Sequence, residues 1–381
     1  MSAIWVVHVA TYFFFLAYGL TLPVLPLYLH ALGVAPGWVG WVVALMPLAG
    51  ILLRPWGGWA ADGWSRKWPT VIGMALGSAA GVFYLGPFGA VLFGRFLQGA
   101  AMALFAPSSL AITSDLAPEG RVGTVMGTRN LLIGLGVMSG SALGGVLADG
   151  LGFSGVFLAV VGVQAVFVPV LLRLSETLTR PVRRRWWEGF AQVVRIRPIL
   201  AATVANMGFA AVFALIQTFY PLLLAEAGYS AAWVGAFLGF YSLVSVLFRL
   251  PAGRLADRVA AGRVALWGFV GASVGLGVLW AFPVPPWAFA AALVMGAGAG
   301  FYLPANIVAV TKAAPLELRG SAFSLFTASW DLGGLIGPPL GGVLVAGFGV
   351  GVVLPLAVLL ALGVTLLYVR LTAPKPRVGL R

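Results

Sequence analysis

The chain of 381 residues is 61% hydrophobic and only 9% charged, with a net charge of +13. Soluble proteins carry roughly 25% charged residues, so this composition excludes a water-soluble fold and indicates a polytopic membrane protein. The chain has no cysteine, and His8 and His30 are its only histidines, so disulfides are excluded and no metal or cofactor site is predicted.

Long apolar segments without strand alternation predict an all-α membrane protein. A helix of about 20 residues crosses roughly 30 Å of hydrocarbon. Twelve such segments fit, and the first is read as a span because no basic region or cleavage site of a removable signal is visible. They are 4–29, 38–60, 69–86, 89–113, 121–148, 152–174, 198–224, 231–255, 263–282, 287–311, 319–346 and 350–371.

The basic residues predict the orientation of these spans. They fall in alternate loops and in the C-terminal tail. The opposite loops contain no Lys or Arg, and only His30, Asp149 and Glu226 lie near their edges. The positive-inside rule then places both termini in the cytoplasm of a bacterial inner membrane. Loops of this kind meet anionic lipid, so the positive charge does not indicate a nucleic-acid partner. The basic residues in these loops, at their edges and in the tail are Arg66, Lys67, Arg121, the arginines of 173–197, Arg254, Arg258, Arg263, Lys312, Arg319 and those of the tail.

The sequence also contains an internal repeat, in which the second half of the chain matches the first. An offset of 195 matches Pro26 with Pro221, Trp38 with Trp233, Arg54 with Arg249 and Asp62 with Asp257, and an offset of 197 matches 143–147 with 340–344. This repeat predicts two pseudo-twofold-related six-helix bundles, 1–174 and 198–381 with its short tail. The segment 175–197 between them is either an interfacial helix with Trp186 and Trp187 at the headgroups or a plain cytoplasmic linker. Two such bundles are a transporter layout, with a binding site between them at mid-depth.

The loops that follow spans 2 and 8 carry related motifs. The first reads Gly58-Trp59-Ala60-Ala61-Asp62 followed by Arg66 and Lys67, and the second reads Gly253-Arg254-Leu255-Ala256-Asp257-Arg258 followed by Arg263. Both resemble the Gly-x-x-x-Asp-Arg signature of the major facilitator superfamily, although the first has Gly63 where the family usually has arginine. Together with Arg54 and Arg249 they are candidate gating residues. A carboxylate there can accept hydrogen bonds from a neighbouring helix N-terminus and latch the cytoplasmic side.

Two further motifs resemble the same family. Arg95-Phe96-Leu97-Gln98-Gly99 matches an Arg-x-x-Gln-Gly pattern associated with proton-coupled members. Gly337-Pro338-Pro339-Leu340-Gly341-Gly342 in span 11 matches the Gly-Pro-x-x-Gly-Gly pattern that antiporters carry in span 5. Span 5 itself has Ser141 in place of the proline. The resemblance, which covers essentially the whole chain, implies the major facilitator fold.

Charged residues that occur inside a span of one half only are candidates for coupling, because a charge at the bilayer centre is costly and needs a cavity or a partner. Asp331 lies roughly 18 Å beyond Arg319 and is our candidate proton-coupling site, with a fixed salt bridge as the alternative. Arg95 is expected to face the cavity or span 1, or to hydrogen-bond between helices. Arg129 is expected to reach an anionic substrate group or to extend to the cytoplasmic edge.

Polar and aromatic residues at helical spacing predict the substrate cavity. On span 1, Thr11, Phe14 and Tyr18 share one face with Leu22, and the 195 offset places Asn206, Phe209, Phe213 and Gln217 at the same sites of span 7. For any single aromatic residue, packing against lipid or another helix is the competing interpretation. The remaining candidates are Gln98, Asn130, Tyr241, Tyr302, Asn306 and Trp330.

These features predict secondary active transport by alternating access, with proton-coupled efflux of amphipathic or drug-like compounds by a monomer as the favoured function. A sugar or metabolite transporter is the first alternative, and a cavity dominated by Asn130, Asn206, Gln217 and Asn306 would favour it. A receptor or lipid-handling protein on a transporter scaffold is the second. No phosphate-binding Gly-x-x-x-x-Gly-Lys loop and no nucleophile–base–orienter set occurs, so an enzyme is not expected.

Overall fold

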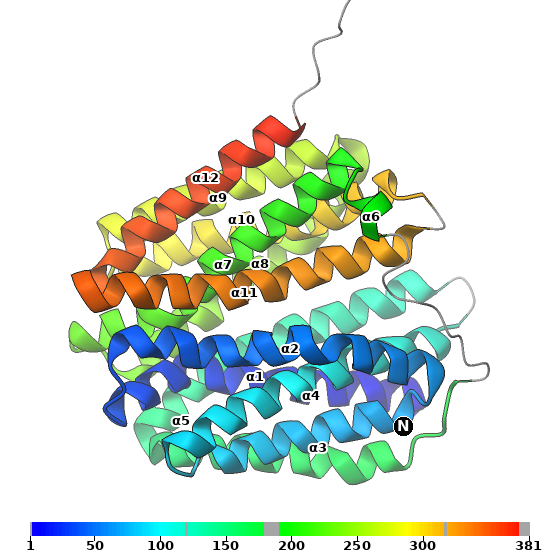
Figure 1. Cartoon of the computed structure of the whole chain (residues 1–381), viewed down its shortest axis with the longest axis horizontal. Coiled ribbons are helices and arrows are strands. Elements are labelled where there is room, and N and C mark those ends of the chain that lie inside the picture. The colour runs from blue at the N-terminus through cyan, green and yellow to red at the C-terminus, as the bar shows by residue number, and fades with distance from the viewer. Residues whose placement is uncertain (1, 119–120, 179–189, 316–317, 373–381) are drawn as a thin grey trace, which may run out of the picture.

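A computed structural model describes residues 2–118, 121–178, 190–315 and 318–372, and every long element in these ranges is a helix (Figure 1). The first part of the chain forms α1 (Ala3–Ala31), α2 (Pro36–Gly63), α3 (Lys67–Phe83), α4 (Phe88–Asp115) and α5 (Val122–Leu172). After the short α6 (Phe190–Val193) come α7 (Arg197–Glu226), α8 (Ala231–Arg258), α9 (Ala261–Ala281), α10 (Trp287–Ala313), α11 (Arg319–Phe348), the 3-10 turn η2 (Val350–Val352) and α12 (Val353–Thr372).

Ten of the helices in the described ranges are long and apolar enough to cross a membrane, so the expected count of twelve is not reproduced. One reason is that the expected spans 121–148 and 152–174 form the single element α5, which is broken only at Gly152, with φ 70° and ψ 176°. The other reason is that α3 has only 17 residues, slightly fewer than a span needs. The expected interfacial residues Trp186 and Trp187 lie outside the described residues.

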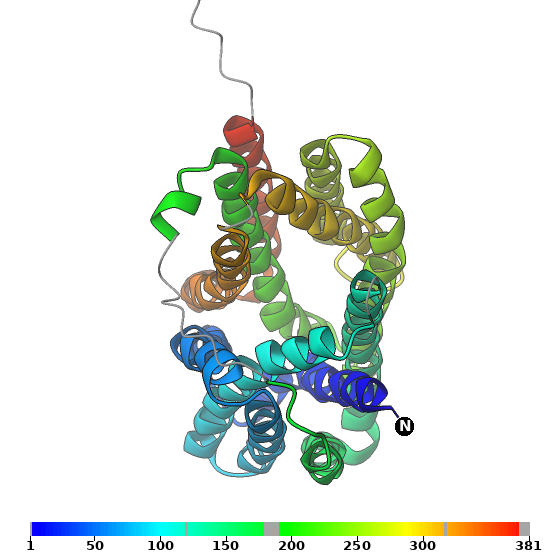
Figure 2. The ribbon, with the colours of Figure 1, turned by 90° about the vertical axis from the view of Figure 1, so that its right-hand side faces the viewer.

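The helices form two groups that meet along a seam. Figure 1 shows α1–α5 below and α7–α12 above, and Figure 2 shows most of the helices end-on in the same two groups. Two helix pairs cross the seam extensively, namely α2 with α11 and α5 with α8. Both pairs join one element from each repeat, so the seam is built twice from equivalent parts.

Glycines at four-residue spacing let the central helices of each group touch through their backbones. A β-carbon at Gly140 of α5 would lie 2.2 Å from the Leu16 carbonyl oxygen of α1, and one at Gly337 of α11 would lie 2.2 Å from the Ala211 carbonyl oxygen of α7. Neighbouring glycines one turn away make similar backbone contacts, at Gly136 and Gly144 on α5 and at Gly333 on α11, whereas Gly341 packs against the side chains of Leu215 and Phe219.

The second glycine of each Gly-Gly pair crosses the seam instead. A β-carbon at Gly145 would lie 2.2 Å from the Ala231 carbonyl oxygen of α8, and one at Gly342 would lie 2.2 Å from the Gly37 carbonyl oxygen of α2. Successive residues on a helix point about 100° apart, so one glycine pair can serve both contacts. The repeat in the sequence therefore corresponds to a repeat in helix packing.

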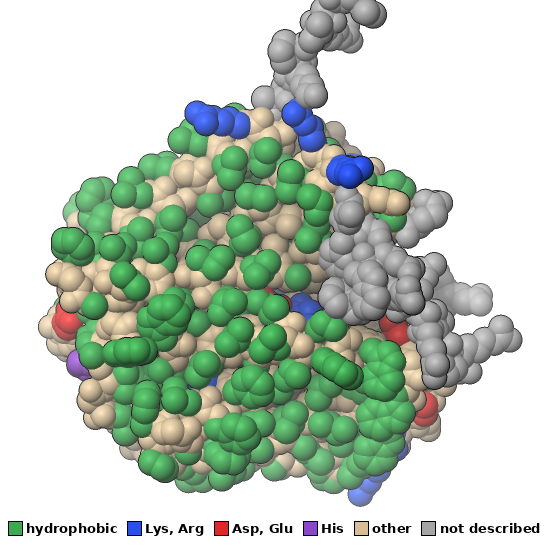
Figure 3. Space-filling view, viewed as in Figure 1, with side chains coloured by type: hydrophobic (Ala, Val, Ile, Leu, Met, Phe, Trp, Pro, Cys, Tyr) green, Lys and Arg blue, Asp and Glu red, His purple; other side chains and the backbone are tan. Residues whose placement is uncertain are grey.

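The outside of the molecule is suited to lipid. Figure 3 shows hydrophobic side chains over most of the visible face, with most of the visible Lys and Arg side chains at its upper edge and at its lower right. Trp56, Trp59, Trp64 and Trp68 are all about half exposed around the C-terminal end of α2 and the start of α3. Tryptophan is enriched where a membrane protein meets the headgroups, so this end of the bundle lies at an interface.

Candidate functional site

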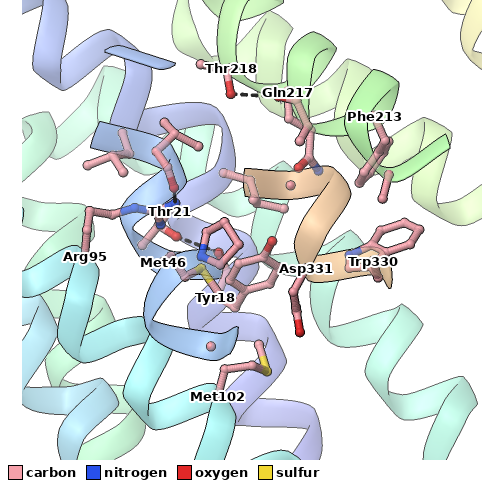
Figure 4. Close-up of a pocket in the computed structure, with 18 of the residues that line it drawn as sticks. Tyr18, Thr21, Met46, Arg95, Met102, Phe213, Gln217, Thr218, Trp330 and Asp331 are labelled. Atoms are coloured by element: carbon pink, nitrogen blue, oxygen red, sulfur yellow. Dashed lines mark hydrogen bonds between the residues drawn. The ribbon is translucent and has the colours of Figure 1, made fainter. Parts of the chain in front are cut away.

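The candidate site is a cavity of about 110 Å³ between the two helix groups (Figure 4). Its lining residues come from α1, α2 and α4 on one side and from α7 and α11 on the other. Most of the wall is apolar or aromatic, including Leu22, Met46, Met102, Phe213 and Trp330. A mainly apolar wall with a few polar groups is typical of small-molecule sites.

An ion pair crosses the seam in the wall of this cavity. Arg54 Nη2 of α2 lies 2.5 Å from Asp331 Oδ2 of α11. Among the described residues this oxygen makes no hydrogen bond of good geometry, so the contact is mainly ionic. The two side chains are 33% and 15% exposed, and both line the cavity. The pair therefore connects the halves at a point that a bound molecule or water can reach.

Arg95 lies in the same wall and belongs to a buried polar network. Its guanidinium donates to Gln98 Oε1 at 2.6 Å and to the Val43 carbonyl oxygen at 2.8 Å. Gln98 Oε1 also accepts from the Tyr84 hydroxyl, and Gln98 Nε2 donates to Thr21 Oγ1. The network joins α1, α2, α3 and α4, and all its acceptors are neutral. Arg95 thus both hydrogen-bonds between helices and faces the cavity, as the two sequence interpretations proposed separately.

The charges of the cavity wall do not cancel. The lining includes two arginines, Arg54 and Arg95, but one acidic residue, Asp331. Asp331 is paired with Arg54, whereas Arg95 has no acidic partner among the described residues. The wall therefore has a net positive charge when Asp331 is ionised.

The predicted cavity residues are divided by the structure into two sets. Tyr18, Arg95, Phe213, Gln217, Trp330 and Asp331 line the cavity, together with Arg54 from the gating set. On α1 and α7 the residues nearer the N-terminal ends of the predicted stripes lie elsewhere. Phe14, for example, stacks on Phe105 of α4 with ring centroids 4.0 Å apart, and Thr11 donates to the Val7 carbonyl oxygen of its own helix.

The corresponding residues of α7 pack inside the second half. Asn206 donates to the Phe326 carbonyl oxygen and to Ser329 Oγ of α11, each at 3.0 Å. Phe209 packs against Tyr302 of α10, with ring centroids 4.1 Å apart. In this conformation these residues hold helices together, and their place in a substrate cavity stays a prediction.

The other candidates outside the cavity are also accounted for by packing or exposure. Arg129 is 5% exposed and donates to the Ala106 carbonyl oxygen and Ser109 Oγ of α4, within one half. Asn130 is exposed. Tyr241 packs on Phe213, directly behind the cavity wall. Asn306 is fully buried on α10, and neither polar atom of its amide has a hydrogen-bond partner in the described part of the chain.

Four further residues line the cavity but were not predicted from the sequence, namely Thr21, Met46, Met102 and Thr218. Thr21 could have been found by extending the α1 stripe by one turn from Tyr18. The methionines carry no polar signal, and an apolar residue on a span is indistinguishable from a lipid-facing one by spacing alone.

The predicted latch is absent at the ends of α2 and α8. Asp62 and Asp257 are exposed, and neither has an ion pair or hydrogen bond with a described residue. Their glycine partners Gly58 and Gly253 have no atom within 4 Å of an added β-carbon. The expected contact between a carboxylate and a neighbouring helix N-terminus is therefore not made by either motif in this conformation.

The same kind of contact is made by two other acids. Asp149 Oδ1 and Oδ2, at the opposite end of the bundle, accept from the backbone N–H groups of Ala231 and Ala232, each at 3.0 Å. These two residues begin α8, so an acid of one half caps a helix of the other. The favourable field at a helix N-terminus and the open N–H groups explain why a carboxylate binds there.

Glu176 caps the start of α3 within the first half. Burial raises the pKa of this carboxyl, but hydrogen bonds from the Ser65 hydroxyl and the backbone N–H groups of Leu178, Arg66 and Lys67 outweigh it and lower the pKa to about 2. Beside it, Arg66 pairs with Asp115 at the end of α4. The basic residues of the first motif loop thus hold the loop, α4 and the chain after α5 together.

Comparisons with known proteins agree with this architecture. The chain is 28% identical over 356 residues to the multidrug resistance protein MdtG of Serratia proteamaculans, which covers 87% of this chain and 84% of that protein. It is 27% identical over 351 residues to the MdtG protein of Escherichia fergusonii, with 87% and 85% covered.

Solved structures show the same fold. The nucleoside transporter NupG superposes with a TM-score of 0.81 at 15% identity, covering 98% of this chain and 100% of that one. The human organic anion transporter MFSD10 superposes with a TM-score of 0.72 at 17% identity, covering 96% and 98%. At such low identity these likenesses concern the fold alone.

The family model described as Major Facilitator Superfamily matches residues 7–245 and again residues 202–380. The two matches together cover nearly all of the chain, as the internal repeat leads one to expect. With ten apolar helices in the described ranges, a cavity between two helix groups and family matches that span residues 7–380, this non-enzymatic membrane transport protein belongs to the Major Facilitator Superfamily.

Proposed function

We propose that the protein is a proton-coupled efflux transporter for amphipathic, drug-like molecules, and that it works by alternating access. The observation that carries the proposal is the Arg54–Asp331 ion pair, which joins the two halves inside an aromatic-walled cavity. The MdtG relatives, whose names describe multidrug resistance proteins, support the substrate class. We place it in the bacterial inner membrane as a multi-pass monomer with both termini in the cytoplasm.

In the proposed cycle the bundles 1–174 and 198–381, with six spans each, rock about the cavity, and the segment 175–197 links them. In this count α5 supplies two spans divided at Gly152, and α3 supplies one. Tight glycine contacts and the Asp149 cap close the seam at the ends that we assign to the extracellular side. The free carboxylates of Asp62 and Asp257 then correspond to a latch that has opened on the cytoplasmic side. This combination describes a cytoplasm-facing state.

The proposed proton coupling depends on the Arg54–Asp331 ion pair, which joins the two halves at the cavity. When a proton binds Asp331, the carboxyl loses the charge that attracts Arg54, and the ionic link between α2 and α11 disappears. A single proton can therefore change the relative stability of two arrangements of the halves, which is the requirement for coupling. The cavity gives this carboxyl access to water and to substrate.

The test uses purified protein in proteoliposomes with an imposed pH gradient. Asp331→Asn should abolish gradient-driven transport of a lipophilic probe, while exchange of labelled for unlabelled probe without a gradient continues. Glu226→Gln, at an exposed carboxyl outside the cavity, is the matched control and should transport normally. Gradient-driven transport by Asp331→Asn would show that the proton is bound elsewhere.

The amides that would have favoured a sugar or metabolite transporter are mostly outside the cavity. Of Asn130, Asn206, Gln217 and Asn306, only Gln217 lines it. A wall of aromatic and methionine side chains favours substrates with apolar surface over substrates rich in hydroxyl groups, because buried hydroxyls need several hydrogen-bond partners. We therefore retain amphipathic compounds as the substrate class.

A further inference from the structure

The sequence repeat leaves Arg249 without the acidic partner that its counterpart Arg54 has. Arg249 of α8 corresponds to Arg54 of α2 at the offset of 195, and Gly134 of α5 corresponds to Asp331 of α11 at the offset of 197. On the α2–α11 seam, Arg54 and Asp331 form an ion pair. On the α5–α8 seam, a β-carbon at Gly134 would lie 3.5 Å from Arg249 Nη1. The second arginine therefore points at the position of a carboxylate that the chain does not have.

The structure gives Arg249 no substitute for this missing acid. It makes no ion pair and no hydrogen bond with the described residues, and its Nε is buried without a partner. The ionisable side chains of its own half that lie near it are the phenols of Tyr241 and Tyr302, which are neutral at physiological pH. The Tyr302 hydroxyl is itself buried without a hydrogen-bond partner in the part of the chain that the structure describes. A cation within a membrane needs a counter-charge or water, so an arginine left in this way is expected to have a function.

Arg249 is connected to the cavity through one aromatic residue. Tyr241 lies near Arg249, and its ring packs on Phe213 of the cavity wall with centroids 5.2 Å apart. The cavity wall already has a net positive charge from Arg54, Arg95 and Asp331. Both observations favour a negatively charged molecule and disfavour a cation, because like charges repel strongly in a low-dielectric site.

We propose that Arg249, whose guanidinium lies beside Gly134 and has no acidic partner among the described residues, forms a subsite for an acidic group, such as a carboxylate or sulfonate, on an amphipathic molecule that the protein transports. The substrate supplies the anion that Asp331 supplies on the other seam, and its apolar part lies against the aromatic side chains next to Phe213. The inference rests on the proposed transport function and narrows its substrates to organic anions. Export of an anion in exchange for a proton moves two positive charges inward, so an inside-negative potential drives it.

The test measures binding without any gradient, so it does not depend on proton coupling. The probes are 1-naphthalenesulfonate and naphthyltrimethylammonium, which share a ring system and differ in charge. Each is titrated into the full-length protein in nanodiscs of zwitterionic lipid, by calorimetry. The wild type is expected to bind the sulfonate at least tenfold more tightly than the ammonium compound.

Two substitutions should remove this preference by different routes. Arg249→Gln deletes the cation, and Gly134→Asp adds the missing carboxylate beside it, so each should weaken sulfonate binding by about tenfold or more. Gly134→Asn is the matched control, because it adds the same bulk against Val246 without the charge, and it should weaken sulfonate binding much less than Gly134→Asp does. Arg249→Lys keeps the charge and should retain most of the preference.

Several outcomes would overturn the inference. Equal affinity of the wild type for both probes, unchanged sulfonate binding in Arg249→Gln, or equal losses in Gly134→Asp and Gly134→Asn would each do so. An acidic lipid headgroup is the other source of the same chemistry, and repeating the titration with phosphatidylglycerol separates the two. If this lipid weakens sulfonate binding in the wild type but not in Arg249→Gln, the site holds lipid and not a transported molecule.

Failure of the general transport proposal would look different. In that case no probe would be moved by a pH gradient, while the charge preference in binding would be unaffected. Conversely, gradient-driven transport of the ammonium probe with no difference between wild type and Arg249→Gln would leave proton-coupled transport intact and remove the anion subsite.

Discussion

Gly40 of α2 and Pro338 of α11 are in direct contact across the seam. A β-carbon added to Gly40 would lie 2.0 Å from the Pro338 carbonyl oxygen. The other seam repeats the relationship, since a β-carbon on Gly235 would lie 2.6 Å from the Ser141 carbonyl oxygen. The serine that departs from the family pattern on α5 thus occupies the same position as Pro338. Contact through the backbone explains this, because a carbonyl oxygen is present whatever the side chain.

Gly40→Ala is expected to prevent closure of the α2–α11 seam at the end that we assign to the extracellular side. A methyl group cannot be fitted 2.0 Å from an oxygen without moving a helix, and overpacking of this kind costs about 1–3 kcal/mol. The protein should shift away from the state described here and lose transport activity. Electron–electron resonance distances between labels on Ala35→Cys and Phe348→Cys, at the two sides of this seam, should lengthen.

The control for this substitution is Gly162→Ala, at a helical glycine where an added β-carbon meets no atom within 4 Å. It should leave both the distances and the transport rate unchanged. Because the natural chain contains no cysteine, no background labelling has to be removed first. Normal distances in Gly40→Ala would mean that the helices separate elsewhere.

Asp149→Ala should weaken the closed state through the second seam. The substitution leaves the N–H groups of Ala231 and Ala232 uncapped, and loss of an N-cap costs about 0.5–2 kcal/mol, with the lower part of this range expected because Asp149 is exposed. The same spin-label pair should then show a new population at longer distance. Asp149→Asn keeps one acceptor oxygen and should have an intermediate effect.

Glu226→Gln is the matched control for the Asp149 series, since it removes an exposed carboxyl on the same predicted side. No change in the distance distribution is expected for it. An identical distribution in the wild type and Asp149→Ala would show that the cap does not contribute to closure.

Charge reversal should test the Arg54–Asp331 pair separately from its coupling role. Either Arg54→Gln or Asp331→Asn leaves one charge unpaired in the cavity wall, and we expect a loss of about 1–2 kcal/mol in stability, intermediate between exposed and buried pairs. The swapped variant Arg54→Asp with Asp331→Arg should recover most of it. Thermal unfolding in detergent of the wild type, the two single variants and the double variant Arg54→Gln with Asp331→Asn measures the coupling, and additive effects would argue against a direct interaction.

The pH dependence of the Glu176 contact follows from its lowered pKa. A carboxyl whose pKa falls from 4.5 unfolded to about 2 folded stabilises the folded state above pH 4.5, and the contribution is lost as pH falls toward 2. Protection of the Thr177 and Leu178 amides from hydrogen exchange, corrected for intrinsic rates, should therefore be constant from pH 8 to about pH 5. Glu176→Gln should reduce it throughout this range. Loss of protection in the wild type near pH 6 would contradict the assignment.

The sequence alone determined the membrane class, the repeat and the family, because these depend on composition, residue spacing and short motifs, which can be read without a structure. Low charge over long apolar segments dictates helices in lipid, since unpaired backbone groups cannot be left there. Gly140 and Gly337, which the repeat places at equivalent positions, make equivalent helix contacts in the structure. The depth of Asp331 identified it as unusual before any partner was known.

Only the tertiary structure decided which charges meet. Nothing in the spacing of Arg54 and Asp331 brings them together, because they lie on different halves and their contact depends on how α2 crosses α11. Periodicity likewise places Phe14 and Tyr18 on one face of α1, yet Tyr18 lines the cavity whereas Phe14 packs on Phe105. A helix pattern fixes the direction of a side chain relative to its own axis, whereas the neighbour it meets depends on how whole helices pack.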